Sequence, residues 1–555
     1  MKLREMVQWN KGRSVFWQVL LLLVVLLYVA GLHWSNDGLW YQGDSPRHAA
    51  NGLFWWDFLA SFPVNPIKFA LSYYACYPVI NPATYPPVFY LIEGVAFKIF
   101  GASPFVAKGL VLAFALFAGL YATAWLRRWV SEEAGWGSAL LVLQPGIISW
   151  SNSITLNIPS MALMLAAMYH ARRWIEAPKS RQIYLTAFFA LLGILTYYTT
   201  GIVVFVTLAW IIAEGRWGVL WDRRVLILCL LSALLLVPFA AVLFRWDARH
   251  AVTAVYPGPQ YRLVLHHWTY YLKAVKFLFS IPLLVFGGIA IVSGLCDQRW
   301  RREVKLQLIW VIVCYVGFSY LLTKEERYIL VLGPPLVILC VIGLISFLRL
   351  FAAWLKRDLP WVFLAAIALL SGIHIVTAPF VHVPQVKGFK EMVAFFEEVA
   401  PEERVLYDGT HNGVFSFYMR ARDPDFKRGV VLGNKLLYTS SMSLDRHLSE
   451  RVSSSADVIR VLQKEGGCRW LAIEWRDGSD RFVSMRALRE AVTGPEFQFV
   501  KSFPVIAHQT KRVDVYRFLL PVEQPNDQEL PFPRLGKGKV FRSKPIERTP
   551  DGFIY

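Results

Sequence analysis

Charged side chains are scarce in this sequence. They make up 17% of its 555 residues, whereas an average soluble protein has about 25%. Hydrophobic residues make up 56%, above the usual range of about 45–50%. This composition argues against a single soluble domain, a disordered chain and a fibrous repeat. The apolar excess indicates a protein that faces lipid.

Cysteine is also sparse, and its spacing excludes one class of site. The sequence has six cysteines and no Cys-x-x-Cys pair, so a zinc ribbon is excluded. Four cysteines lie in or beside apolar runs, as small core residues do. Cys76 and Cys468 fall outside the predicted membrane spans, and a disulfide between them stays open.

Acidic residues are outnumbered by basic ones. The chain has 39 Asp and Glu against 58 Lys and Arg, a formal net charge of +19. In a soluble protein this excess would suggest nucleic acid, but no zinc-finger or ribonucleoprotein pattern is present. The basic residues mostly flank apolar runs, as at 126–128 and 221–224. We therefore expect contact with anionic lipid or a phosphate-bearing substrate, and no nucleic acid.

Long apolar runs dominate the first two thirds of the chain. The run at 15–32 is long enough to cross a bilayer, and no Ala-x-Ala cleavage site follows it. Ten further runs predict eleven membrane spans in all. They lie near 104–126, 134–149, 158–172, 183–199, 201–214, 225–244, 274–295, 305–322, 328–350 and 359–379. The run at 87–100 is short, and we expect a helix at the membrane surface there.

Charge fixes the predicted orientation. With a cytoplasmic N-terminus, eleven spans place the main Lys and Arg clusters in the cytoplasm, as the positive-inside rule requires. The odd number sends the C-terminal segment to the external, periplasmic face. We therefore expect a multi-pass protein of the inner (plasma) membrane.

The chain divides into three predicted parts. Residues 1–384 form a polytopic α-helical membrane domain, and residues 385–520 form a soluble external α/β domain with alternating helices and strands. Its strands are expected at 404–407, 430–432, 470–475 and 513–519. Residues 521–555 form a tail rich in Pro and basic residues, with no expected regular structure.

A polar motif follows the first span, in a long predicted external loop at 33–86. Asp44 stands there close to Arg47 and His48. A carboxylate at a membrane surface is costly unless it is paired, hydrated or used, and an acid beside a cation and an imidazole could act as a general base. The alternative is a helix start capped by Asp44 or Ser45, with Pro46 in its first turn.

Three further motifs lie at predicted external boundaries. Tyr85 begins an aromatic stretch with two prolines, and Asn157 begins the fourth span. Lys324-Glu325-Glu326-Arg327-Tyr328 precedes a late span, where dense charge suggests phosphate contact. Interfacial aromatics and a solvated turn with internal ion pairs are the alternatives.

The order and sidedness of these motifs resemble the GT-C membrane glycosyltransferases. More narrowly, residues 15–380 resemble bacterial proteins similar to protein O-mannosyltransferases and to the lipid A aminoarabinose transferase. The resemblance implies that Asp44 takes the proton of the acceptor hydroxyl and that Arg327 contacts the donor phosphate. Three positions depart from the family pattern: Ser45 follows Asp44 where many members have Glu, Tyr85 stands where some have Lys, and Asn157 stands where Asp is frequent.

This resemblance implies transfer of a sugar from a polyprenyl-phosphate donor to an external acceptor hydroxyl, with inversion. Because the leaving phosphate is an anion, Arg327, Lys324 and Arg47 are the expected phosphate contacts. The expected substrate pocket holds His48, Tyr85, Asn157, Glu326 and Tyr328. The partners are thus a polyprenyl-phosphate sugar, membrane lipid and an unknown acceptor. A transporter or flippase, or an assembly protein that binds through its C-terminal domain, is the alternative.

The sequence also has residues that could bind a metal ion. His48, Asp57, His266 and His267 could bind a divalent ion, but adjacent histidines rarely both ligate one ion. No His-Glu-x-x-His or His-x-x-x-His pattern occurs. The other reading is histidines near lipid headgroups, and we expect no cofactor.

Overall fold

A computed structural model gives the structure of most of the chain. It describes residues 2–33, 37–38, 44–82, 84–245, 264–355, 361–439, 449–476, 482–507, 510–524, 528–531, 540–549 and 552–554. The chain folds into two compact units. The helical unit is Met1–Trp34, Lys108–Pro238 and Tyr256–Val383, and the sheet unit is Ser35–Ala107, Phe239–Val255 and Pro384–Tyr555.

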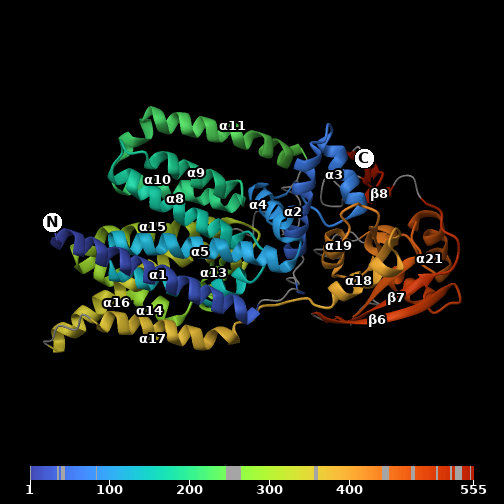
Figure 1. Cartoon of the computed structure of the whole chain (residues 1–555). Coiled ribbons are helices and arrows are strands. Elements are labelled where there is room, and N and C mark those ends of the chain that lie inside the picture. The colour runs from blue at the N-terminus through green and yellow to red at the C-terminus, as the bar shows by residue number, and fades with distance from the viewer. Residues whose placement is uncertain are drawn as a thin grey trace. The chain divides into compact units, whose positions relative to one another are not determined.

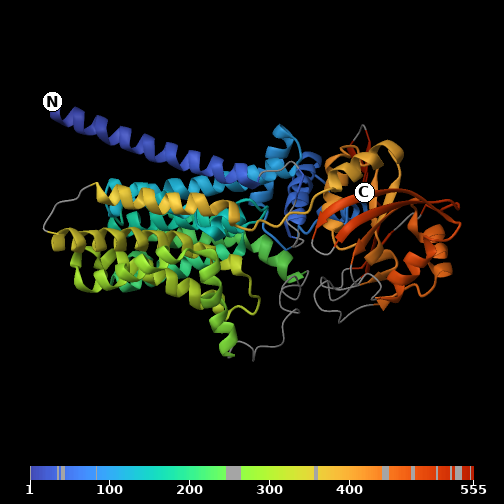
Figure 2. The same ribbon diagram turned by 90° about the horizontal axis from the view of Figure 1, so that it is seen from below.

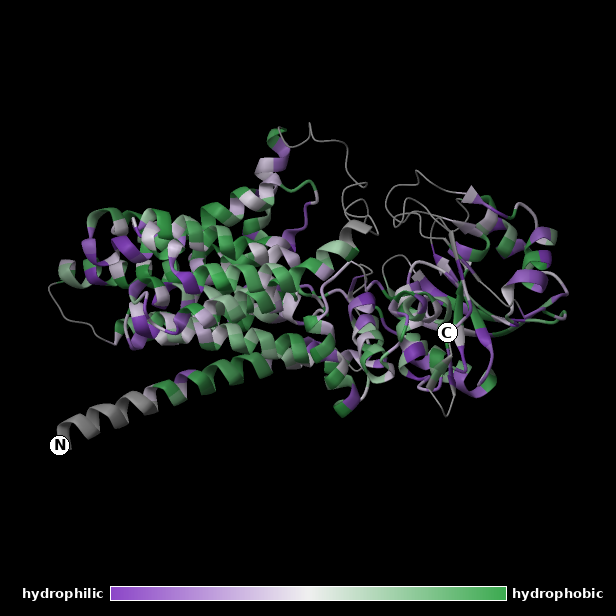
Figure 3. Cartoon of the chain, turned by 90° about the horizontal axis from the view of Figure 1, so that it is seen from above, coloured by the Kyte–Doolittle hydropathy of each residue, from purple (hydrophilic) through white to green (hydrophobic). Residues whose placement is uncertain are grey.

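Long apolar helices make up the helical unit (Figure 1), and Figure 3 shows that hydrophobic residues cover most of their length. The α-helices of this unit, long and short, are in chain order α1 Lys2–His33, α5 Pro104–Trp129, α6 Ala139–Val142, α7 Pro145–Ser151, α8 Asn157–Glu176, α9 Gln182–Ile194, α10 Ile202–Ala213, α11 Arg223–Arg245, α13 Leu265–Leu278, α14 Ile281–Cys296, α15 Gln298–Tyr320, α16 Gly333–Leu355 and α17 Val362–Thr377.

Fewer helices than expected are long and apolar enough to cross a membrane. Among the described residues there are six, with a seventh if α13 and α14, bent by 116°, form one broken span. The predicted number of eleven is therefore not confirmed. Pro145 breaks the run at 134–149 into short pieces, because proline cannot continue a helix from the preceding turn. The runs at 183–199 and 201–214 become helices of 13 and 12 residues.

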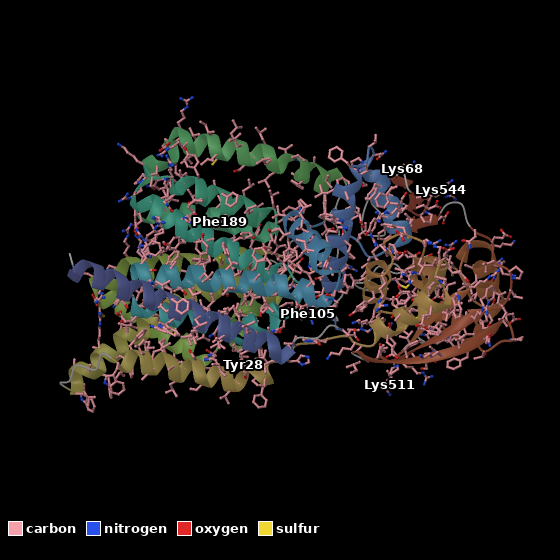
Figure 4. The ribbon with its side chains drawn as sticks, viewed as in Figure 1. Tyr28, Lys68, Phe105, Phe189, Lys511 and Lys544 are labelled. Atoms are coloured by element: carbon pink, nitrogen blue, oxygen red, sulfur yellow. The ribbon has the colours of Figure 1, made fainter. Side chains whose placement is uncertain are left out.

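Close helix contacts hold the helical unit together. Gly343 of α16 lies against α14, where a Cβ atom would come within 1.8 Å of the Phe286 carbonyl oxygen. Only glycine permits this approach. The Tyr28 hydroxyl of α1 (labelled in Figure 4) donates to the Ile375 carbonyl oxygen of α17 at 2.9 Å. Small residues and buried polar contacts of this kind are typical of packed membrane helices.

A buried ion pair marks the end of the helical unit opposite Asn157. Arg172 of α8 pairs with Glu303 of α15, and both side chains are at most 5% exposed. The Trp125 ring nitrogen donates to the same carboxylate at 2.7 Å, and the Arg172 guanidinium stacks on Trp129 at 4.1 Å. These contacts satisfy charges that would be costly if buried alone.

The sheet unit combines the first loop with the C-terminal segment. Its five-stranded sheet has the order β2-β1-β5-β7-β6, with β1 parallel to β2 and β5, and β7 antiparallel to both of its neighbours (Figure 1, Figure 2). The strands are β1 Arg404–Asp408, β2 Gly429–Leu432, β5 Trp470–Arg476, β6 Phe497–Ala507 and β7 Thr510–Phe518, and a short pair is β3 Tyr438–Thr439 with β4 Ser449–Glu450. The helices are α2 Asp44–Ser61, α3 Pro66–Cys76, α4 Val88–Phe100, α18 Phe389–Val399, α19 Asn412–Ala421, α20 Gly433–Leu436, α21 Ser455–Val461 and α22 Val483–Ala491.

The four expected strands are present, but β6 and α19 were not expected. β6 exposes most of its residues, so its sequence lacks the alternation that identifies a half-buried strand. The tail forms two antiparallel pairs, β8 Gln528–Pro531 with β9 Val540–Ser543 and β10 Glu547–Thr549 with β11 Gly552–Ile554. The Ser543 hydroxyl lies 2.9 Å from that of Ser72, so the tail is held against α3.

The two cysteines left open by the sequence are both free and buried. Cys76 donates to the Arg428 carbonyl oxygen at 3.3 Å, and burial raises the pKa of its thiol to about 12. Burial likewise raises the pKa of Cys468 to about 12. Thiols with such pKa values are inert near neutral pH, and the open disulfide is not formed.

Candidate functional site

Helix α2 begins at Asp44, the expected general base. A carboxylate in the first turn is stabilised by the helix dipole, and Pro46 fits the first turn because its missing N–H has no helical partner there. Arg47 and His48 follow at spacings of three and four residues, so they lie on the same helix face as Asp44. Asp44 and Arg47 are both half-buried.

His48 joins α2 to the aromatic motif and to α4. Its side chain is 3% exposed, and its Nδ1 atom lies 2.7 Å from the Tyr90 hydroxyl of α4. Its ring also packs edge-on against Tyr85, with centroids 5.0 Å apart. The structure therefore brings Asp44, Arg47, His48 and Tyr85 into one cluster with Tyr90, which we call the α2 cluster.

Tyr90 is a neutral hydroxyl in this cluster. Burial raises its pKa well above the ordinary value, and the nearby Tyr85 and the negative charge of Asp44 raise it further. Tyr90 lies in the aromatic motif, but apolar residues surround it in the sequence. The sequence therefore gave no reason to distinguish it from an ordinary buried residue of the helix.

A buried acid, Glu93, lies one turn beyond Tyr90 in α4. Glu93 is fully buried, and a Cβ atom on Gly52 of α2 would come within 2.6 Å of its carboxylate. Burial raises the pKa of Glu93 well above its ordinary value. The sequence does carry a signal for Glu93, because it is the single acid inside the apolar run at 87–100. Its burial is consistent with tight packing of α4 on α2.

The second group of expected site residues lies in the helical unit. Asn157 is the first residue of α8, and its Nδ2 atom donates to the Arg327 carbonyl oxygen at 3.4 Å. The Arg327 side chain is 7% exposed, and its guanidinium lies 5.4 Å from the centre of the Trp150 ring. A buried cation stacked on an aromatic face is well placed to neutralise a phosphate.

Lys324 caps the end of α15. Its Nζ atom donates to the carbonyl oxygens of Phe318 at 3.1 Å, Ser319 at 2.5 Å and Leu321 at 2.6 Å. Burial lowers the pKa of this amine to about 8. Its role in binding a phosphate stays a prediction, because the structure accounts for its position by helix capping.

Glu326 and Tyr328 complete the second group. They lie in the short 3-10 helix Glu326–Leu332 that leads into α16, with Glu326 exposed and Tyr328 half-buried. The Tyr328 ring lies 6.1 Å from Phe318 and 6.4 Å from Tyr197. We call Asn157, Lys324, Glu326, Arg327 and Tyr328, together with Trp150, the Arg327 cluster.

Two of the residues considered for a metal have hydrogen-bond partners within the protein. The described part of the chain has no group of three or more His, Cys, Asp or Glu that could hold an ion. His48 bonds to Tyr90, and the Asp57 carboxylate accepts from Tyr73 at 3.0 Å and Arg420 at 2.5 Å. These contacts account for the positions of both side chains.

Comparisons with known proteins identify a shared fold. Residues 84–244 match the model of a family described as dolichyl-phosphate-mannose-protein mannosyltransferase. No curated protein matches the chain. ArnT from Cupriavidus metallidurans, solved bound to undecaprenyl phosphate, is 16% identical with a TM-score of 0.58, covering 92% of this chain and 99% of that one. Its apo form gives a TM-score of 0.59 at 15% identity, covering 92% and 100%.

A second protein has a similar fold, at lower identity and a lower TM-score. The archaeal oligosaccharyltransferase AglB from Archaeoglobus fulgidus, in complex with an inhibitory peptide and a dolichol-phosphate, is 12% identical with a TM-score of 0.53. It covers 89% of this chain, which spans 74% of AglB. The protein therefore has several helices suited to a membrane and resembles the GT-C glycosyltransferases in fold.

Proposed function

We propose that this protein moves a sugar from a polyprenyl-phosphate-linked donor to an acceptor hydroxyl on the external face of the membrane, with inversion. The observation that carries the proposal is the fold shared along 92% of the chain with ArnT, which was solved with undecaprenyl phosphate bound. The AglB complex, which holds a dolichol-phosphate, supports the same class of donor.

The Arg327 cluster is suited to the donor phosphate. When the glycosidic bond to phosphate breaks, the leaving group is an anion, so fixed positive charge lowers the barrier more than a strong acid would. Arg327 supplies the guanidinium. Asn157 donates a hydrogen bond to the backbone carbonyl oxygen of Arg327, and the guanidinium itself lies over the Trp150 ring. In this proposal Lys324 and Arg47 add positive charge, and Glu326 and Tyr328 line the sugar pocket.

The α2 cluster is suited to the acceptor. Asp44 takes the proton of the acceptor hydroxyl while the acceptor oxygen attacks the anomeric carbon and the polyprenyl phosphate leaves from the opposite side. One new C–O bond forms, one C–O bond breaks, and configuration inverts, as in reactions that use a single carboxylate base. His48 and Tyr85 supply the surface on which the acceptor lies.

Charge and contact support the proposed side of the membrane. The buried pair of Asp57 with Arg420 joins the first loop to the C-terminal domain, so both lie on one side of the bilayer. The basic loops between predicted spans favour the cytoplasm, which supports an external site in the inner (plasma) membrane. The tail and the α/β domain would then be periplasmic.

The alternative is a transporter or flippase of a lipid-linked substrate. Such proteins place charged or broken-helix sites near the membrane midplane. The buried pair in the helical unit instead joins the end of α8 to the second turn of α15. Its position at the helix ends favours a structural role, and the enzyme is the better supported function.

A transfer assay tests the proposal. Purified protein in proteoliposomes is given a panel of undecaprenyl-phosphate sugars, mannose included, together with an envelope extract as the source of acceptor. We expect one donor to be consumed, with release of undecaprenyl phosphate and an inverted anomeric configuration in the product. Movement of intact donor across the bilayer without transfer would instead establish the flippase.

A further inference from the structure

The C-terminal sheet has a place where related sheets bind ligands. β1 and β5 are parallel neighbours, and the chain leaves them in opposite directions, from β1 through α19 to β2 and from β5 through α22 to β6. In parallel sheets, ligands bind beyond the carboxyl ends of two such strands. The start of α19, with its free backbone N–H groups, borders this place and would suit an anion.

The protein's own carboxylate fills that position. Glu474 of β5 is fully buried, and its carboxylate accepts from the backbone N–H of His411, just before α19, at 3.1 Å. The hydroxyls of Tyr407 at 2.7 Å and Thr410 at 2.8 Å donate to the same group. Because an internal anion already satisfies these donors, the domain is not built to bind a nucleotide or free phosphate there.

The first loop of the chain lies against α19 instead. A Cβ atom on Gly413, in the first turn of α19, would come within 3.2 Å of Pro46, two residues after Asp44. The Tyr418 hydroxyl of α19 donates to the Asp37 carboxylate at 2.9 Å, on the other side of Asp44 in the sequence. The segment that carries Asp44 is therefore held from both directions by one helix.

The far end of α2 is fixed to the same helix. The Arg420 guanidinium of α19 donates to Asp57 at 2.5 Å and to the Tyr73 hydroxyl at 2.9 Å. Arg420 and Asp57 are 5% and 9% exposed, so water does not compete for this pair. Helix α19 therefore contacts α2 near both ends, at Pro46 through Gly413 and at Asp57 through Arg420.

We infer that α19 positions the catalytic base: Gly413 and Arg420 are positioning residues that set the location of Asp44, and the C-terminal domain serves the transfer reaction by binding the first loop. This inference rests on the proposed function. It predicts that small changes at the Gly413–Pro46 contact alter the rate of transfer while donor binding is kept.

A graded series at Gly413 tests the inference. Gly413→Ala displaces Pro46 by a few tenths of an ångström, and Gly413→Leu displaces it further. Because a misplacement of about 1 Å can lower a rate about 100-fold, we expect kcat to fall about threefold for Ala and more than about tenfold for Leu, with an unchanged KM for the donor. Gly466→Ala, whose Cβ would make an ordinary 3.4 Å contact in the same domain, is the matched control and keeps normal kcat.

A cysteine pair checks the contact without relying on a damaged fold. In the double variant Pro46→Cys and Gly413→Cys, oxidation should form a disulfide that neither single variant forms, and the oxidised protein should transfer sugar at the same rate as the reduced double variant. Failure of the folded double variant to cross-link would overturn the contact. Reversible loss of transfer on oxidation would overturn fixed positioning, because it would mean that α19 leaves α2 during turnover.

Asp44→Asn separates this inference from the proposed function. An inactive Asp44→Asn with a graded loss at Gly413 supports both. An inactive Asp44→Asn with a folded Gly413→Leu of normal kcat overturns the positioning role alone. A fully active Asp44→Asn overturns the proposed base and the positioning role with it.

Discussion

The buried pair of Arg420 with Asp57 provides a quantitative test of how the first loop is held. Arg420 donates to Asp57 at 2.5 Å, to the Tyr73 hydroxyl at 2.9 Å and to the Asp423 carbonyl oxygen at 2.8 Å, and its guanidinium lies 4.1 Å from the centre of the Phe426 ring. Removing one partner of such a pair leaves an uncompensated charge, at a cost of about 3–5 kcal/mol. We therefore expect Arg420→Met to lower the free energy of unfolding by about that amount.

A double-mutant cycle isolates the pair itself. Asp57→Leu should also be destabilising, but the double variant Asp57→Leu with Arg420→Met should be less destabilised than the sum of the two, because no buried charge remains. We expect a coupling energy of about 2–3 kcal/mol. The measurement is urea unfolding of the full chain in detergent micelles, followed by tryptophan fluorescence.

An exposed ion pair at the end of α19 serves as the control. Arg422 and Glu397 lie 2.6 Å apart, but their side chains are 34% and 45% exposed. Water screens such a pair, so its coupling energy should be no more than about 1 kcal/mol. If the cycle at Asp57 and Arg420 gave a coupling as small as this control, burial of the pair would not be what joins the loop to the domain.

Three further predictions follow from the helical unit and its ends. Arg327→Ala should weaken binding of undecaprenyl phosphate by about 10-fold or more, as native mass spectrometry would measure, because a buried charged contact is lost; unchanged binding would contradict the phosphate contact. Gly343→Ala should lower stability by about 1–3 kcal/mol through overpacking, whereas Gly372→Ala, which meets open space, should not. Burial lowers the pKa of Lys324 from 10.5 to about 8, so between these pH values the unfolded chain binds more protons than the folded one and stability should rise with pH; thermal unfolding of Lys324→Met should lack this rise.

Local patterns in the sequence predicted much of the fold. The apolar run at 104–126 became α5, and the strand at 404–407 became β1, because hydrophobic runs and alternation report burial directly. The start of α2 at Asp44 also followed from local chemistry. Hydropathy did not predict the break at Pro145 or the short helices after α8, since a run of apolar residues gives no information on where the backbone bends.

The contacts that build the site depend on long-range packing. Arg420 and Asp57 are 363 residues apart, and nothing near either residue identifies the other as its partner. Tyr90 lies in the aromatic stretch that begins at Tyr85, yet its hydrogen bond to His48 depends on how α4 packs on α2. Glu93 is a lone acid in an apolar run, but its burial depends on the close approach of Gly52, which the sequence does not show.

The most direct measurement is sugar transfer by Asp44→Asn in the purified full chain, beside Asp297→Asn as a control. Asp297 caps α15 by accepting from the Arg299 backbone N–H at 2.8 Å, a role that asparagine fills equally well, so this control should keep normal activity. Because a general base contributes about 100-fold to 10,000-fold, Asp44→Asn should lose at least about 100-fold in kcat while it unfolds at the same temperature as the wild type. Transfer by Asp44→Asn at the rate of the control would contradict the account.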